Sequence, residues 1–149
     1  MMNHAEIARD LFYEGYNCAQ AVFCAFTDVT GYDLATSARM ASSFGAGIGR
    51  LRETCGVVSA AALVLGIRYG YDDPADPEAK TRHYALVREF VERFRAKNAT
   101  INCRELLTNA GLAPESGGTP EARTEEFYKR RPCLRLVQDA AGLLDEFLR

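Results

Sequence analysis

The chain has 149 residues, of which 48% are hydrophobic and 26% charged, a composition typical of a globular protein rather than a disordered or fibrous one. Its 18 basic and 20 acidic side chains are interleaved, so we expect no basic surface that could hold the phosphate backbone of a nucleic acid. A chain of this length can bury a core without disulfide bonds. We therefore expect one domain spanning residues 1–149 and no nucleic-acid partner.

Two further observations concern membranes and the cellular compartment. The longest apolar run, residues 57–67, contains Ser59 and Gly66 and is shorter than the about 20 residues that a helix needs to cross a bilayer. The first residues lack the basic and then apolar pattern of a secretory signal. We predict a cytoplasmic protein with no membrane partner, whose five cysteines stay reduced and serve metal binding or catalysis rather than a disulfide framework.

The first third of the chain predicts two helices. Asn3 can cap a helix whose apolar spacing continues to Phe26, with an interruption at Gly15. Asp33 can cap a second helix over residues 34–43. No stretch shows the sustained alternation that is typical of a strand.

A glycine-rich segment and a small-residue helix come next. Residues 45–49 read Gly-Ala-Gly-Ile-Gly, where positive backbone torsions or a close backbone approach cost little. No strand precedes these glycines and no Lys-Ser or Lys-Thr pair follows them, so the segment lacks the context of a phosphate-binding loop. Residues 53–66 are mostly small or aliphatic and predict the central, buried helix.

The second half of the chain predicts further helices. Asp76 and Pro77 give cap and first-turn signals for a helix over residues 77–98, which we expect to be the most amphipathic of the chain. Its apolar stripe consists of Tyr84, Val87, Phe90, Val91 and Phe94. Asn102 can cap a short helix over residues 103–108, and a last pair is expected over 120–130 and 133–148. The fold class predicted is all-α, a single-domain bundle of about five to seven helices.

Three of the cysteines, Cys55, Cys103 and Cys133, fall at predicted helix starts. Arginines lie beside each of them in the sequence: Arg50 and Arg52, Arg104, and Arg130 and Arg131. A helix start and nearby positive charge both depress the pKa of a thiol, and the thiolate is the form that binds a metal or attacks a disulfide. Ser59, one turn after Cys55, can donate a hydrogen bond to its sulfur. We therefore expect reactive thiolates at these positions.

The remaining cysteines and the two histidines give weaker signals. Cys18 follows Gly15 by one turn and can be either a buried small residue or a site residue, whereas Cys24 points to another face of the helix and is expected in the core. We expect His4 to be solvated near the terminus and His83 to be packed or partly exposed beside the apolar stripe. Neither histidine has a context that suggests a catalytic base.

Five segments resemble, in the right order, a family of redox-active proteins named for the cysteine pattern C…GCAxxG…C…C. These segments are residues 15–22, 44–50, 54–60, 103–106 and 132–133. The resemblance extends from about residue 5 to the end of the chain. The segment similar to GCAxxG departs from it at three positions, with Thr54 for the first glycine, Gly56 for the alanine and Ser59 for the last glycine.

The resemblance implies an all-helical protein whose patterned cysteines are redox-active or bind a metal or an iron-sulfur cluster. The four cysteines concerned are Cys18, Cys55, Cys103 and Cys133. We expect them to converge at one end of the bundle, as candidates both for catalysis and for metal ligation. Arg50, Gly56 and Ser59 are expected to help hold a cofactor.

Several functions stay open at this point. The four cysteines can hold an iron-sulfur cluster or a thiolate-bound metal, or two of them can cycle between dithiol and disulfide with an unknown redox partner protein or small molecule. Alternatively, the protein is a helical binding or assembly module with buried thiols, in which the small-residue helix packs in a homo-oligomer. A third reading, an enzyme with one activated cysteine as nucleophile, lacks a convincing base.

Overall fold

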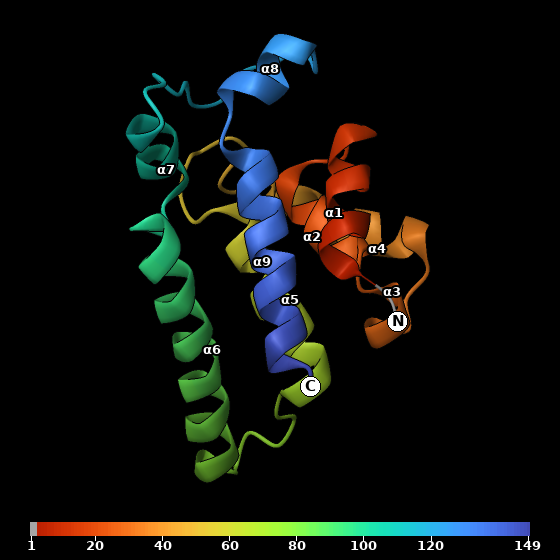
Figure 1. Ribbon diagram of the computed structural model, residues 1–149. Helices are drawn as coiled ribbons and strands as arrows, with labels where there is room; N and C mark the ends of the chain where they lie inside the picture. The colour runs from red at the N-terminus through yellow and green to blue at the C-terminus, as the bar shows by residue number, and fades with distance from the viewer. Residues whose placement is uncertain (1–2) are drawn as a thin grey trace.

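The structure is all-α. The computed structural model describes residues 3–149, is 65% helical and contains no strand in that range (Figure 1). Its elements are α1 His4–Tyr13, α2 Cys18–Cys24, α3 Thr27–Thr30, α4 Leu34–Ala41, the 3-10 turn η1 Ser42–Phe44, α5 Gly56–Tyr69, α6 Pro77–Asn98, α7 Cys103–Asn109, α8 Glu125–Arg130 and α9 Cys133–Phe147. Of the nine helices in residues 3–149, seven have seven residues or more, which confirms the predicted helical bundle. None of the helices in residues 3–149 is both long enough and apolar enough for a membrane crossing.

Short polar side chains begin most of the helices. The predicted caps Asn3, Asp33, Asp76 and Asn102 each accept a hydrogen bond from a backbone amide in the first turn, and Asn17 and Thr124 do the same for α2 and α8. The predicted break after α1 is confirmed, because Gly15 has φ 107°, which side-chain-bearing residues rarely adopt. This turn lets α2 begin in a new direction at Cys18.

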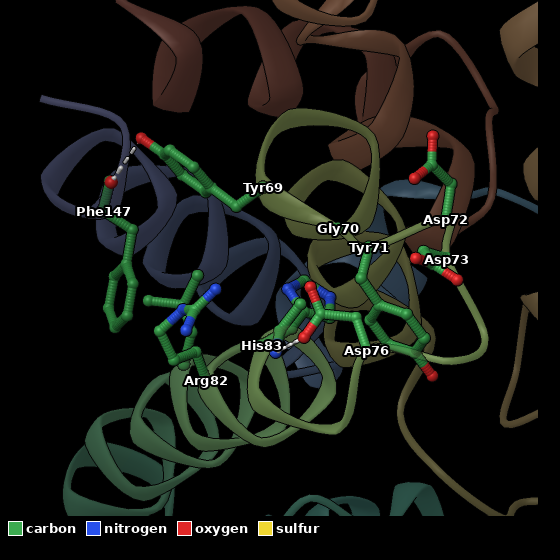
Figure 2. Close-up of a pocket in the computed structure, with 11 residues that line it drawn as sticks. Tyr69, Gly70, Tyr71, Asp72, Asp73, Asp76, Arg82, His83 and Phe147 are labelled. Carbon is green, nitrogen blue, oxygen red and sulfur yellow. Dashed lines mark hydrogen bonds between the residues drawn. The ribbon is translucent and has the colours of Figure 1, made fainter.

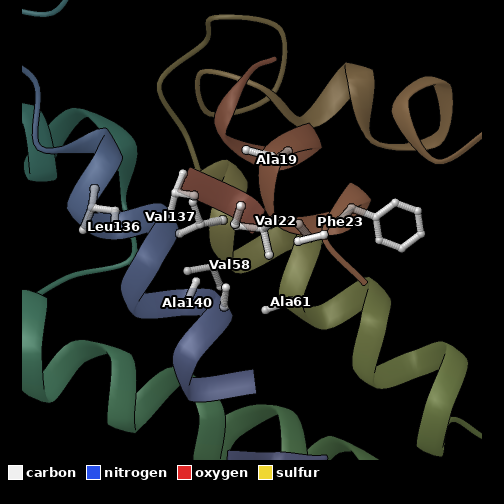
Figure 3. Packing of buried hydrophobic residues seen from close by; sticks show 14 of the residues in the cluster. Ala19, Val22, Phe23, Val58, Ala61, Leu136, Val137 and Ala140 are labelled. Atoms are coloured by element: carbon white, nitrogen blue, oxygen red, sulfur yellow. The ribbon is translucent and has the colours of Figure 1, made fainter. Parts of the chain in front are cut away.

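The core lies where α2, α5 and α9 meet (Figure 3). Figure 3 shows Val22 of α2, Ala61 of α5 and Ala140 of α9 converging on one apolar region, and all three are fully buried. Small and aliphatic residues occupy nearly every turn of α5, so neighbouring helices can lie close to it on several sides. The prediction of a central, buried, small-residue helix is therefore confirmed.

Helix α6 packs on the outside of this core, against α9 and α5. Phe90 and Phe94 are buried, and the Phe90 ring contacts the edge of Phe147 at 5.6 Å between ring centroids. Tyr84 does not continue the stripe, since 49% of it is exposed and its hydroxyl lies 3.1 Å from that of Tyr71. The expectation that α6 is the most amphipathic helix is wrong, because α9 has the more one-sided apolar face.

The first turns of α6 border a cavity instead of the core. This cavity has a volume of about 640 Å³ and lies between the end of α5, the start of α6 and Phe147. Figure 2 shows Tyr71 and His83 side by side there, and their ring centroids are 6.2 Å apart. His83 is half-buried, as predicted.

The last predicted pair of helices is shorter than expected. Helix α8 begins at Glu125 rather than at residue 120, because Thr124 provides the cap. The preceding residues are not helical, and Arg123 reaches across to α1, where its guanidinium donates hydrogen bonds to the carbonyl oxygens of Phe12 and Tyr16 at 2.9 and 2.8 Å. A local sequence pattern cannot show that residues 120–124 form a tertiary contact instead of the first turn of a helix.

His4 is buried, and the expectation that it is solvated is wrong. Its ring stacks on Phe26 at 4.1 Å between centroids and is only 7% exposed. Nδ1 lies 2.6 Å from an Asp145 carboxylate oxygen and Nε2 lies 2.9 Å from one of Asp28. This histidine therefore ties α1 to α3 and α9.

We expect the His4→Ala variant to lose about 2–3 kcal/mol of unfolding free energy, since it removes a stacked ring and two hydrogen bonds to charged groups. Urea denaturation measures the loss. Glu6→Gln, an exposed change on the same helix, is the matched control and should stay within about 0.5 kcal/mol of the parent. A His4→Ala variant as stable as this control would contradict the bridging role.

Candidate thiol site

Each of the four patterned cysteines lies at the start of a different helix. Cys18, Cys103 and Cys133 are the first residues of α2, α7 and α9, and Cys55 immediately precedes α5. The predicted helix starts at Cys55, Cys103 and Cys133 are confirmed, and Cys18 has the same placement. The unpaired amides of four helix starts are therefore available near the four sulfurs.

A short backbone pairing brings two of these cysteines together. Thr54 and Asn102 form an isolated antiparallel bridge. Beside it, the amide of Cys55 donates to the carbonyl of Ile101 at 2.7 Å, and the amide of Cys103 donates to that of Glu53 at 2.6 Å. The starts of α5 and α7 are thus held side by side, although they are far apart in the sequence.

Cys18 packs against the start of α5 at Gly56, which has no side chain. A Cβ atom built on Gly56 would lie 2.7 Å from Cys18 Sγ and 2.8 Å from the carbonyl oxygen of Phe44. Real Cβ atoms do not approach other atoms so closely, so only glycine leaves room for the sulfur at this point. Gly56, an expected site residue, therefore positions Cys18 next to Cys55.

The four thiols lie in one cluster. Cys18 packs on Gly56 beside Cys55, the Thr54–Asn102 bridge holds Cys55 and Cys103 side by side, and Cys133 lines the same cavity as Cys18. Burial raises the pKa of Cys55 well above its usual range, and neighbouring Cys18, Cys133 and Cys103 raise it further. Burial raises the pKa of Cys133 to about 12, and Cys18 is the thiol that adds most to this rise. Such mutual effects require short distances. That the four cysteines act as one functional site stays a prediction.

The expectation of low-pKa thiolates is wrong for Cys55 and Cys133, whose pKa values are raised. Burial also raises the pKa of Cys18, although hydrogen bonding from the backbone amides of Ala46, Ala19 and Gly56 acts in the opposite direction. Arg131 and Arg123 lower the pKa of Cys133, but less than burial raises it. The loss of water around the sulfurs outweighs the helix starts and the arginines, so these thiols are protonated near neutral pH.

The segment between η1 and α5 wraps around Cys18 with an unusual backbone. Ala46, Ile48, Arg50 and Arg52 have φ values of 54°, 66°, 64° and 61°, a left-handed conformation that costs side-chain-bearing residues about 1 kcal/mol each. The glycine-rich segment was predicted to allow such torsions, but four residues with side chains share them. Strained backbone of this kind is concentrated at functional sites.

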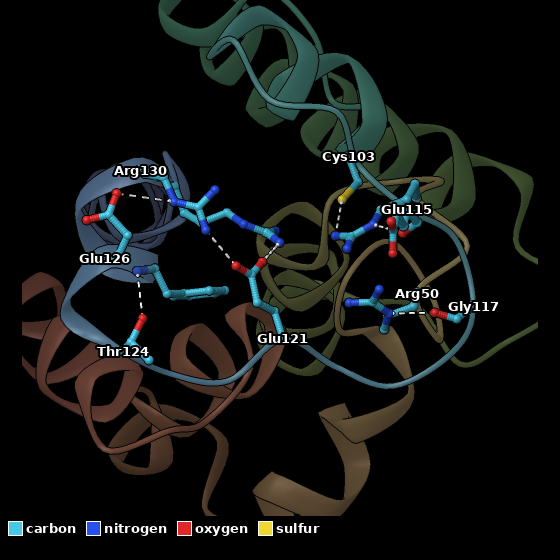
Figure 4. A network of polar contacts seen from close by, with 11 residues as sticks. Arg50, Cys103, Glu115, Gly117, Glu121, Thr124, Glu126 and Arg130 are labelled. Carbon is cyan, nitrogen blue, oxygen red and sulfur yellow. Dashed lines mark hydrogen bonds and ion pairs between the residues drawn. The ribbon is translucent and has the colours of Figure 1, made fainter.

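Two arginines from this segment face the cluster and the loop after α7. Arg52 is 3% exposed, and its guanidinium donates to Cys103 Sγ at 3.7 Å and to the carbonyl oxygen of Glu115 at 2.9 Å (Figure 4). Arg50, an expected site residue, donates through Nε to the carbonyl oxygen of Gly117 at 2.7 Å, as Figure 4 also shows. The loop after α7 is thereby fastened over the site.

A cavity of about 350 Å³ opens onto half of the cluster. Cys18 and Cys133 line it, whereas Cys55 and Cys103 do not and are only 5% and 8% exposed. The charged residues that line the cavity are Arg50, Arg52, Arg123, Arg131 and Glu121. A small molecule in this cavity would meet Cys18 and Cys133 first.

Residues that lie outside the site agree in part with expectation. Cys24 is buried 4.0 Å from the carbonyl oxygen of Leu34, and burial alone raises its pKa to about 11, so the prediction that it belongs to the core is confirmed. Ser59 is half-buried, and in the part of the chain that the structure describes no hydrogen bond joins its hydroxyl to Cys55. Neither His4 nor His83 lines the cavity.

The four cysteines were also expected as metal ligands. Tetrahedral thiolate sites hold four sulfurs at about 2.3 Å from one point. Within the described residues, no group of three or more His, Cys, Asp or Glu side chains is placed to hold a metal ion. All five cysteines are free thiols. Metal ligation by these cysteines stays a prediction.

Comparison with known proteins agrees with the cysteine pattern. A family described as "Putative redox-active protein (C_GCAxxG_C_C)" matches residues 16–147, which include all four cluster cysteines. The chain belongs to this family. No curated protein and no solved structure matches the chain.

The three positions at which this chain departs from GCAxxG lie in and beside the first turns of α5. Thr54 contributes to the bridge with Asn102 through its backbone, which any residue except proline can provide. Gly56, in place of the family's alanine, gives Cys18 its space. Ser59 lies one turn into α5 and is half-buried.

Sequence reasoning missed several residues of the site. Asn17 caps α2 and contacts Gly45, where a Cβ atom would collide with its side chain. Arg123 and Phe127 line the cavity from the far end of the chain. A cap signal at Asn17 was available in the sequence, but nothing local marks Arg123 or Phe127.

Gly56→Ala should destabilise the protein by about 1–3 kcal/mol, because the added methyl group would displace Cys18 or Phe44. Gly66→Ala is the matched control on the same helix, where a Cβ atom would meet nothing within 4 Å. That substitution should be neutral or stabilise by up to about 1 kcal/mol. Thermal or urea denaturation distinguishes the two, and equal effects would show that Cys18 is not packed on Gly56.

The alkylation rate of Cys133 should depend steeply on pH. Because its pKa is raised to about 12, its thiolate fraction grows about tenfold per pH unit across the range from 7 to 10. Iodoacetamide reacts with thiolates, so labelling of the Cys133 peptide, followed by mass spectrometry, should rise without levelling off. A short unstructured cysteine peptide with blocked ends, whose thiol has an ordinary pKa of about 8.5, should level off above about pH 9.5. A plateau for Cys133 at that pH would contradict the burial effect.

Proposed function

We propose that this protein is a thiol-based redox protein in which Cys18 and Cys133 cycle between dithiol and disulfide. The observation that carries this proposal is that these two members of a four-thiol cluster line the cavity, with the other two buried beside them. Membership of a redox-active family supports the same class of chemistry. Cys55 and Cys103 then act as supporting thiols that tune the pair.

Cys18 is the better candidate for the attacking sulfur. Hydrogen bonding from the backbone amides of Ala46, Ala19 and Gly56 favours its thiolate and so partly offsets burial in setting its pKa. Its thiolate attacks the disulfide of an oxidised partner, so that a mixed disulfide forms and one partner sulfur leaves as a thiolate. The Cys133 thiol then loses its proton and displaces the second partner sulfur, which leaves Cys18 and Cys133 joined.

In this cycle two electrons pass from the cysteine pair to the partner disulfide, which becomes two thiols by taking up the two protons that the pair releases. Reduction reverses the steps, and Cys133 becomes the leaving thiolate when Cys18 is attacked. Arg131 and Arg123 lower the pKa of Cys133 against the effect of burial, which stabilises the thiolate that leaves in this step. The two arginines thus assist the reductive half of the cycle.

The assembly-module alternative has less support from the packing. The small-residue face of α5 is occupied within the chain, since Gly56 contacts Cys18 and Ala19, and Ala60 is fully buried. Part of that face is therefore already used within the chain, whereas Ser59 on it is half-buried. The function proposed here does not depend on an oligomer.

Controlled oxidation tests the proposal. Reduced protein treated without oxygen with one equivalent of diamide, which accepts two electrons and two protons, should lose two thiols and yield a peptide pair linked through Cys18 and Cys133. Cys18→Ser and Cys133→Ser should each abolish this link. Cys24→Ser, on the same helix as Cys18 but outside the cluster, should leave it intact.

Elemental analysis of the reduced protein completes the test. If the reduced protein contains stoichiometric iron or zinc and Cys18→Ser loses that metal, the function is metal-centred and the disulfide cycle is wrong. Five thiols that resist diamide in the folded protein, with neither metal present, would instead favour a module with buried cysteines.

A further inference from the structure

The cavity over Cys18 and Cys133 has an excess of positive charge. Four guanidinium groups line it, those of Arg50, Arg52, Arg123 and Arg131. Glu121 is the acidic side chain in the lining, and it already pairs with Arg131 and with Arg130. Across residues 3–149, no carboxylate lies within ion-pairing distance of the other three.

This charge is costly where it is buried. Arg52 is almost completely removed from water, and a buried cation without an opposite charge loses far more hydration energy than hydrogen bonds to neutral groups return. Its partners are a carbonyl oxygen of Glu115 and the sulfur of Cys103, and neither is a carboxylate. An anion in the cavity would supply the missing countercharge.

The arginines are also held in place before any ligand arrives. The Arg123 guanidinium lies over the rings of Phe12 and Phe127, at 4.4 and 4.9 Å from their centroids, and donates to two backbone carbonyls of the α1 region. Arg50 is fixed through its Nε, while its two terminal amino groups have no hydrogen-bond partner among residues 3–149. A guanidinium fork with free terminal donors matches the oxygens of a carboxylate or phosphate.

We propose that this cavity recognises a small anionic ligand, and that the substrate of the Cys18 and Cys133 pair is an anionic disulfide or thiol carrying carboxylate or similar oxyanion groups. The substrate assignment rests on the proposed redox function. The volume of about 350 Å³ is at the lower end of the range for small-molecule sites, so the ligand is a metabolite-sized molecule.

Two aromatic disulfides of different charge test the substrate class. Dithiobis(nitrobenzoate) carries two carboxylates, and dithiodipyridine is neutral. With either reagent a protein thiolate attacks the disulfide, a protein–reagent disulfide forms, and one aromatic thiolate leaves and is measured by its absorbance. The rate ratio of the anionic to the neutral reagent, normalised to the ratio for free mercaptoethanol, reports anion recognition separately from thiol reactivity.

The parent protein should prefer the anionic reagent, and Arg50→Gln should lower the normalised ratio about tenfold, since it removes a charge-assisted pair of hydrogen bonds. Arg68→Gln, which changes an exposed arginine at the far end of α5, is the matched control and should leave the ratio unchanged. A normalised ratio near one, or one that Arg50→Gln does not alter, would overturn the anionic substrate.

Inorganic phosphate provides a readout that needs no thiol chemistry. At constant ionic strength, replacing chloride by phosphate should raise the melting temperature of the parent and of Arg68→Gln but not that of Arg50→Gln. Absence of this shift would overturn the anion site itself. If phosphate binds through Arg50 but neither disulfide reagent reacts with the folded protein, the anion site stands and the redox function is wrong.

Discussion

The close approach of α2 and α5 at Gly56 is the constraint on which the rest of the site depends. Cys18 Sγ lies near the position that a Cβ atom at residue 56 would occupy, so the first turns of the two helices meet at their backbones. The bridge between Thr54 and Asn102 then adds the start of α7, and the packing of α9 against α2 and α5 adds Cys133. One glycine thereby allows four helix starts to share a small volume.

Bringing the helix starts together also removes water from the sulfurs. Exposed helix starts and arginines would favour thiolates, but here burial dominates and the pKa values of Cys18, Cys55 and Cys133 are raised. The positive charge of the arginines is then not balanced by the sulfurs, because the thiols of Cys18, Cys55 and Cys133 are neutral in the resting protein. The site is thus arranged to stabilise negative charge that arrives with a ligand or that forms during reaction, rather than charge stored on the cysteines.

Much of the fold could be predicted because its signals are local. Asn3, Asp33 and Asn102 mark helix starts through their own side chains, and the small residues of α5 identify the buried helix. His4 and Tyr84 were misjudged because their environments are made by distant segments, Asp28 and Asp145 for the first and Tyr71 for the second. Arg123 was missed for the same reason, since its partners lie in α1.

The sequence by itself determined the helical class, the helix starts at three of the four cysteines and the family to which the chain belongs, since caps, apolar spacing and ordered motifs are read along the chain. Only the tertiary structure decided which thiols face a cavity, which arginines surround it and whether the sulfurs ionise. Those properties depend on water excluded by segments from the whole chain, and the free energy of desolvation is set by what surrounds a group in space rather than by its sequence neighbours.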